Sequence, residues 1–211
     1  MKKLILIFAV LASTITFSQR SFDQYSIEVN YGISLPSSPV PNGANVSDFT
    51  GYSHFDIGAR YMFIPEIGVK LSYGYDKFSD KDISSNNVIY NRFELQAVSN
   101  LVYLFSLESE LFNKVGFLAH GGGGIISANP SSFNSNENIG ILTFGLTPQF
   151  KLSEKFALST DFSYNITLKQ HYSFDGQLIH PNFDSETGGF FNFTVGLKYY
   201  IGSNGEHADW L

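Results

Sequence analysis

The 211-residue sequence has no cysteine, few charged residues and no long internal apolar run. The absence of cysteine excludes a lipid-modified N-terminus, and the histidines show no metal-ligand spacing, so we expect no metal site and no cofactor. Charged residues make up 15% of the chain, against about 25% in a typical soluble domain. No internal apolar run reaches the roughly 18 residues that a membrane helix needs. The formal net charge of −6 gives no support to nucleic-acid binding, which usually leaves a basic footprint.

Residues 1–18 have the three parts of a secretory signal peptide. Lys2 and Lys3 are basic, residues 4–11 are apolar, and small polar residues follow. An N-terminal anchor helix is the alternative, but the apolar segment is short and turns polar early. We therefore predict cleavage near Ser18 and export of one domain, since the chain length favours a single domain.

The rest of the chain alternates between apolar and polar residues. In residues 192–201 (NFTVGLKYYI) large apolar or aromatic residues alternate with small or polar ones, which is the period of a β-strand. An ordinary sandwich strand would show the same local pattern. Similar alternation occurs earlier in seven segments, at residues 25–34, 54–63, 67–76, 90–104, 114–127, 141–152 and 156–168.

The connections between these segments are alternately long and short. Four long polar stretches lie at residues 35–51, 77–88, 128–138 and 169–189. Between them are short turns at residues 64–66 and 153–155 and a longer connection at residues 105–113. Strands of about ten residues with this alternation are typical of outer-membrane barrels. A soluble lipocalin-type barrel would expose Lys and Glu, whereas the polar faces here are mostly Ser, Thr, Gly and Asn. The pattern predicts an all-β fold, an eight-stranded antiparallel up-and-down transmembrane β-barrel.

The glycine run 121–124 does not predict a phosphate-binding loop. Such a loop needs a Lys-Ser or Lys-Thr after the glycines and a following helix, and the sequence has neither. We interpret the run as part of a strand in which glycine permits bending or close approach.

These features resemble the OmpA-like outer-membrane proteins, specifically their N-terminal eight-stranded barrel. The resemblance rests on the strand pattern, the loop alternation, the signal peptide and the segment 190–201. Within that segment Thr194, Gly196, Tyr199 and Ile201 resemble the closing-strand signal of outer-membrane barrels. The resemblance implies a barrel at residues 19–201, a short periplasmic tail at residues 202–211, and no peptidoglycan-binding domain.

The polar faces of the strands should line the barrel interior. They carry both acids and bases: Glu28, Asp56, Arg60, Lys70, Arg92, Glu94, Lys114, Asp161 and Lys198. An eight-stranded barrel is just wide enough for side chains to fill, and buried charges must pair. We predict an ion-pair network that plugs the lumen, with a small-conductance porin as the functional alternative.

One loop offers an enzymatic alternative. His171, Ser173 and Glu186 loosely resemble the His-x-Ser and downstream Glu of outer-membrane lipid A deacylases, in which Ser would be the nucleophile and His the base. That family has Asn directly after the serine, whereas this chain has Phe174.

We therefore expect a protein that is not an enzyme. The resemblance implies a monomer in the cell outer membrane that contacts lipid, lipopolysaccharide and the assembly machinery. Its role is predicted to be structural, or to be contact with an extracellular ligand through loops 35–51, 77–88, 128–138 and 169–189.

Overall fold

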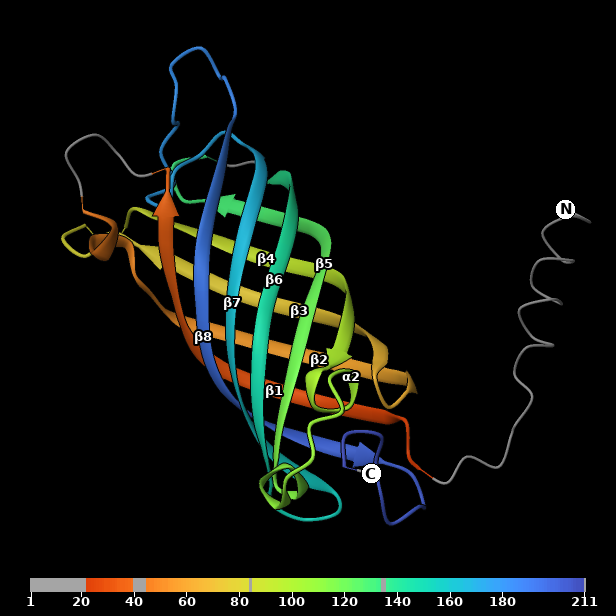
Figure 1. Ribbon diagram of the computed structural model, residues 1–211. Coiled ribbons are helices and arrows are strands. Elements are labelled where there is room, and N and C mark those ends of the chain that lie inside the picture. The colour runs from red at the N-terminus through yellow and green to blue at the C-terminus, as the bar shows by residue number, and fades with distance from the viewer. Residues whose placement is uncertain (1–21, 40–44, 84, 134–135, 211) are drawn as a thin grey trace, which may run out of the picture.

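The computed structural model describes residues 22–39, 45–83, 85–133 and 136–210, so the predicted signal peptide lies outside the described residues. Eight antiparallel strands form a closed barrel in which each strand pairs with the next and β8 pairs with β1 (Figure 1). The predicted fold class is confirmed. The strands are β1 (Tyr25–Ser38), β2 (Gly51–Ile64), β3 (Ile67–Ser79), β4 (Asn87–Asn100), β5 (Val115–Pro130), β6 (Glu137–Lys151), β7 (Phe156–Gln170) and β8 (Glu186–Ile201).

The strands extend further into the predicted long loops than the sequence indicated. The ladder between β1 and β8 continues to Ser38 and Gly189, and that between β3 and β4 continues to Ser79 and Asn87. Backbone pairing continues past the end of the apolar alternation, so polar residues are also paired. The long connections are therefore residues 39–50, 80–86, 131–136 and 171–185, and the predicted loop limits were wrong by several residues.

The fourth strand was predicted to run to Leu104, but it ends at Asn100. The Asn100 side chain accepts a hydrogen bond from the Val102 N–H at 3.1 Å and begins the short helix α2 (Leu101–Leu104). A 3₁₀ turn, η2 (Glu110–Asn113), follows before β5. Asn is a favoured N-cap residue, which explains why the apolar alternation does not continue as a strand here.

The two ends of the barrel differ. The four long connections gather at one end, which we call the loop end and which includes the 3₁₀ turn η1 (Val46–Phe49). The turns 65–66 and 152–155, the β4–β5 connection 101–114 and the C-terminal residues lie at the other end, called the turn end (Figure 1). The two short turns follow the usual pattern of outer-membrane barrels, whereas the connection 101–114, which contains α2 and η2, is longer than the loop-end connections 39–50, 80–86 and 131–136.

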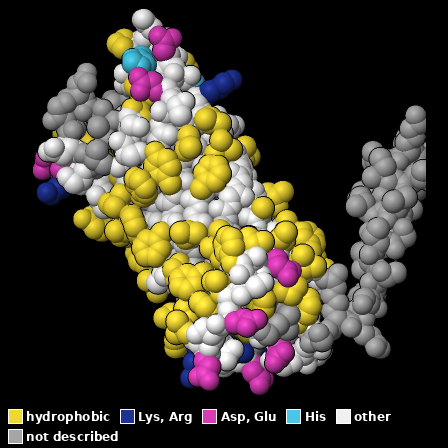
Figure 2. Space-filling view, viewed as in Figure 1, with side chains coloured by type: hydrophobic (Ala, Val, Ile, Leu, Met, Phe, Trp, Pro, Cys, Tyr) yellow, Lys and Arg dark blue, Asp and Glu magenta, His cyan; other side chains and the backbone are white. Residues whose placement is uncertain are grey.

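The outer wall is apolar and the interior is polar. Leu71 is 61% exposed and Phe93 is 55% exposed, whereas Lys198 and Asn165 are fully buried. Figure 2 shows the apolar side chains covering the wall, with the acidic side chains near the two ends. Within the described ranges, no helix has the length and hydropathy needed to cross a membrane.

Two glycines on β5 allow β4 to approach closely. A Cβ atom on Gly122 would lie 2.1 Å from the Leu95 carbonyl oxygen, and one on Gly124 would lie 1.9 Å from that of Phe93. Any side chain at either position would clash with the β4 backbone. The close approach of β4 therefore requires glycine at these two positions of the run.

Candidate functional site

The interior of the barrel contains linked ion pairs and hydrogen bonds, and Asp76 is the centre of the part nearer the loop end. Its Oδ1 atom accepts from Ser34 Oγ at 2.6 Å and Asn192 Nδ2 at 2.9 Å, and it lies 2.6 Å from His54 Nδ1. Its Oδ2 atom accepts from Arg92 Nε at 2.6 Å. Side chains from four other strands, β1, β2, β4 and β8, thus meet at this one fully buried carboxylate of β3.

Arg92 continues this network to Glu94, the next lumen residue on β4. The guanidinium donates to Glu94 Oε1. The other carboxylate oxygen of Glu94 accepts from Gln96 Nε2 at 3.0 Å and Thr143 Oγ1 at 2.5 Å. Both carboxylate oxygens of Glu94 therefore have hydrogen-bond donors, which a buried ion pair requires to offset its desolvation.

Glu28 is the centre of the part nearer the turn end. Lys70 Nζ donates to its Oε1 at 2.9 Å, and Lys198 Nζ lies 3.5 Å from its Oε2. Lys198 also donates to Gln149 Oε1 at 2.8 Å. All four side chains are buried, and they come from β1, β3, β6 and β8, so the group links strands on different sides of the lumen.

Asp161 and Asp56 border a small central cavity. Asp161 Oδ2 lies 2.8 Å from His120 Nε2 and accepts from Thr147 Oγ1 at 2.6 Å. Asp56 accepts from Asn30 Nδ2 at 3.1 Å. The cavity measures about 20 Å³, which is room for about one water molecule, and is too small to pass a solute.

The structure places Glu28, Asp56, Arg60, Lys70, Arg92, Glu94, Asp161 and Lys198 inside the barrel, as the alternation predicted. Lys114 was assigned wrongly. It is exposed and is the C-cap of η2, because β5 begins one residue later at Val115.

Four interior residues were missing from the predicted network: His54, Asp76, His120 and Asp209. The alternation could have predicted the first three, because each is an even number of residues away from an inward-facing residue of the same strand. The inward-facing residues are Asp56 in β2, Lys70 in β3 and Leu118 in β5. No periodic signal marks Asp209, which follows the last strand.

An aromatic cluster closes the loop end. Phe174 from loop 171–185 is fully buried against Phe78, with ring centroids 4.7 Å apart. Phe190 lies 5.4 Å from the same ring, and Phe49 of η1 belongs to the same cluster. Two of the long connections therefore fold back into the barrel mouth.

The C-terminal residues close the turn end. Both carboxylate oxygens of Asp209 accept from the Arg60 guanidinium, at 2.9 and 2.5 Å. The Trp210 indole N–H donates to Tyr200 Oη at 2.8 Å, and the Tyr200 hydroxyl lies 3.1 Å from Asp209. The predicted short tail is therefore packed into the barrel rather than extended from it.

Two ionisable groups of this tail are perturbed by their surroundings. Burial alone would raise the pKa of Asp209, but the positive charges and the hydrogen bond around it, with Arg60 the strongest contributor, together hold that pKa well below its usual range. Burial lowers the pKa of His207 to about 4, and its ring stacks on Tyr200 with centroids 4.2 Å apart. The docked tail therefore carries an ionised Asp209 and a neutral His207 at neutral pH.

The residues of the alternative hydrolase triad do not come together. Ser173 is buried and donates to the Pro39 carbonyl oxygen at 3.1 Å. His171 Nδ1 pairs with Glu137, while Glu186 lies 2.6 Å from His180 Nε2. Each group has another partner, so the arrangement lacks the Ser–His–acid contacts that such a site needs.

The residues of the closing-strand signal occupy two faces of β8. Thr194 is buried, and a Cβ on Gly196 would lie 1.9 Å from Asn30 Oδ1. Tyr199 and Ile201 are exposed on the outer wall, where Tyr199 lies 5.1 Å from Phe156, measured between ring centroids. The strand pairs with β1 along its length, from Ile201 opposite Tyr25 to Gly189 opposite Ser38.

No cluster of three or more His, Cys, Asp or Glu side chains suited to a metal ion occurs in the part of the chain that the structure describes.

No protein-family model matches the sequence, and no curated protein matches it. Solved structures do match. Neisserial surface protein A is 10% identical, with a TM-score of 0.56, and the match covers 84% of this chain and 97% of that one. Ail, the attachment invasion locus protein of Yersinia pestis, is 17% identical with a TM-score of 0.51, covering 85% and 99%. The outer membrane protein OprG of Pseudomonas aeruginosa is 10% identical with a TM-score of 0.50, covering 86% and 98%.

At these identities the likeness concerns the fold. Together with the closed eight-stranded topology, it shows that this chain has the eight-stranded outer-membrane β-barrel fold that its OmpA-like sequence pattern predicts.

Proposed function

We propose that this protein is a non-conducting, non-catalytic barrel of the outer membrane that holds a shaped loop surface at the cell exterior. In this proposal the outer wall contacts lipid and lipopolysaccharide, the assembly machinery recognises the closing strand, and the barrel is monomeric. The surface proposed to contact an extracellular ligand is the loop end.

The observation that carries the proposal is the sealed lumen. The ion-pair networks around Glu28 and Asp76 fill the interior at two levels along the barrel axis. The central cavity has a volume of only about 20 Å³. Aromatic side chains close the loop end, and Asp209 with Trp210 closes the turn end. A barrel filled in this way supports a scaffold better than a porin.

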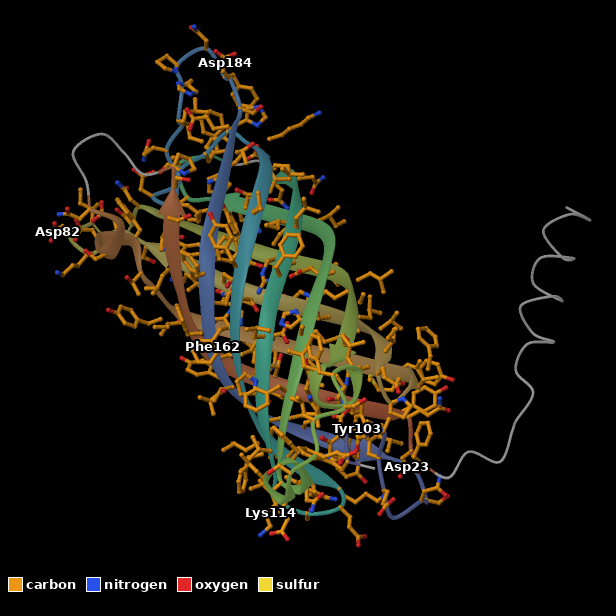
Figure 3. All side chains as sticks on the ribbon, viewed as in Figure 1. Asp23, Asp82, Tyr103, Lys114, Phe162 and Asp184 are labelled. Atoms are coloured by element: carbon orange, nitrogen blue, oxygen red, sulfur yellow. The ribbon has the colours of Figure 1, made fainter. Side chains whose placement is uncertain are left out.

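The loops have the properties of a presented surface. Loop 171–185 is anchored by Phe174 while Gln177 and Phe183 remain exposed. Lys81 and Asp82 in the connection 80–86 are also exposed. Figure 3 shows Asp82 and Asp184 projecting from the loop end on separate loops. Loops held on a rigid scaffold are the usual place for recognition.

A conductance measurement tests the sealed barrel. The refolded protein in planar bilayers should show no steady current, and a porin prepared in the same way serves as the positive control. Because the seal depends on packed charges, a steady open level in the wild-type protein would reject the scaffold in favour of the small-conductance porin.

Cysteine labelling in intact cells tests the orientation. A cysteine at the exposed Gln177 should react with an impermeant maleimide, and a cysteine at Glu154 in the turn 152–155 should react only after the cells are broken. Labelling of Glu154→Cys in intact cells would place the loop end in the periplasm and overturn the proposed surface.

A further inference from the structure

The outer wall of β6, β7 and β8 contains an apolar groove of about 510 Å³. On the face toward the viewer in Figure 2, apolar side chains stand around a white area where backbone and small side chains reach the surface. Figure 3 places Phe162 about halfway between the two ends of the barrel. The groove therefore lies at the level of the hydrocarbon core rather than the headgroups. Its walls are Phe144, Leu146, Phe162, Tyr164, Phe191 and Phe193.

The strand pairing is interrupted directly beside the groove. Leu146 pairs with Phe162, but the next pairing between β6 and β7 is Gln149 with Ser159. Pro148 lies in the gap and has no N–H to donate to a ladder. The register is the same on both sides of this gap, so the β6–β7 seam has a local break in its pairing and no bulge.

The wall is also thin at this place. Gly145 has no side chain, and a Cβ there would lie 2.4 Å from His120 Nε2 and 2.6 Å from Ser163 Oγ. His120 and Ser163 line both the groove and the central cavity. His120 Nδ1 is buried and has no hydrogen-bond partner among the described residues. The polar interior is thus separated from the membrane by one layer of side chains.

We propose that this groove binds one acyl chain of a membrane lipid in a fixed position along the β6–β7 seam. The proposal rests on the membrane placement given under the proposed function. An acyl chain fits the lining because the aromatic walls offer apolar contact and the groove opens into the hydrocarbon layer. The bound chain fills the hollow beside Gly145, and it exchanges more slowly than the lipids around the rest of the wall.

Photo-crosslinking tests this site. The probe is a phosphatidylethanolamine that carries a diazirine in the middle of one acyl chain, incorporated into bilayers with the folded full-length barrel. Peptides of β6–β8 should carry several-fold more crosslink than peptides of β2 and β3. Native mass spectrometry in mild detergent should show one retained lipid on each barrel.

A groove-filling variant gives the matched comparison. Leu146→Trp should abolish the retained lipid and the excess crosslinking, whereas Leu95→Trp, on the outer face of β4 away from the groove, should keep both. Heat-modifiable gel mobility checks that both variants are folded. Uniform crosslinking around the wild-type wall, or equal retention by Leu146→Trp, would overturn the site while leaving the membrane barrel intact. Crosslinking nowhere would overturn the membrane placement itself.

Discussion

Asp209 accepts two hydrogen bonds from Arg60, a residue 149 positions earlier in the chain. Arg60 belongs to β2, whereas Asp209 follows the last strand, so this ion pair ties the C-terminal tail to a strand that is separated from β8 by β1. Both side chains are buried. Removing one partner of a buried pair leaves the other charge without compensation, at a cost of about 3–5 kcal/mol.

We predict that Asp209→Asn releases the tail. The uncompensated Arg60 guanidinium should disfavour docking, and Trp210, the single tryptophan of the chain and only 5% exposed, should move into water. The measurement is a red shift of tryptophan fluorescence together with faster carboxypeptidase digestion. Glu206→Gln, at an exposed position of the same tail, is the control and should change neither. An unshifted spectrum for Asp209→Asn would show that the ion pair does not hold the tail.

Acid should also weaken tail docking, through His207. Its pKa is about 4 when docked, against an ordinary 6.5, so the free tail takes up a proton first as the pH falls. Docking is therefore fully favourable above about pH 6.5 and loses up to roughly a hundredfold in its equilibrium constant by pH 4. Asp209 contributes little above pH 4, because its ordinary pKa of 3.8 leaves it largely ionised in the free tail and its lowered pKa leaves it ionised in the docked tail.

The measurement for this pH effect is Trp210 fluorescence between pH 7 and pH 4. The wild-type spectrum should shift to the red as the pH falls. His207→Phe keeps a ring to stack on Tyr200 but cannot titrate, so its spectrum should stay constant over the same range. A wild-type response that persists in His207→Phe would assign the effect to another group.

Phe174 should determine how firmly the longest loop is held. Phe174→Ala removes a fully buried ring from the aromatic cluster, which costs about 3–5 kcal/mol in a well-packed site. We expect residues 171–185 to become much more sensitive to proteinase K in intact cells. Phe183→Ala, in the same loop but 54% exposed, is the matched control. Equal cleavage of the two variants would mean that the cluster does not anchor the loop.

The two faces of β8 should respond differently to substitution. Tyr199→Asp places a carboxylate on the outer wall, which faces lipid in the proposed membrane placement. There it removes the contact with Phe156 and disturbs the resemblance to the closing-strand signal. Lys198→Gln keeps a donor for Gln149 inside the barrel. We expect a large loss of folded barrel in the membrane fraction for Tyr199→Asp and a small one for Lys198→Gln, measured by heat-modifiable mobility. The reverse order would contradict the importance of the outer face for assembly.

The local sequence by itself determined which strand residues face the outside of the barrel and which face its interior. Period-2 alternation assigns each strand residue to one face, so the eight strands, their order and the inward position of Glu28, Asp56 and Arg92 could be predicted without coordinates. Strand ends were less predictable, because backbone pairing continues through polar residues such as Ser38 and Asn87 that carry no apolar signal.

Only the tertiary structure decided which interior charges meet and what closes the two ends. Alternation says that a side chain points inward, but the partner depends on strand register and on the diameter of the closed barrel, as with Asp76 and Asn192 from opposite parts of the chain. The docking of Phe174 and Asp209 has no periodic signal, since both lie outside the strands. Their positions follow from the unfilled volume and uncompensated charge that the closed barrel presents at its ends, and these exist only once the strands have come together.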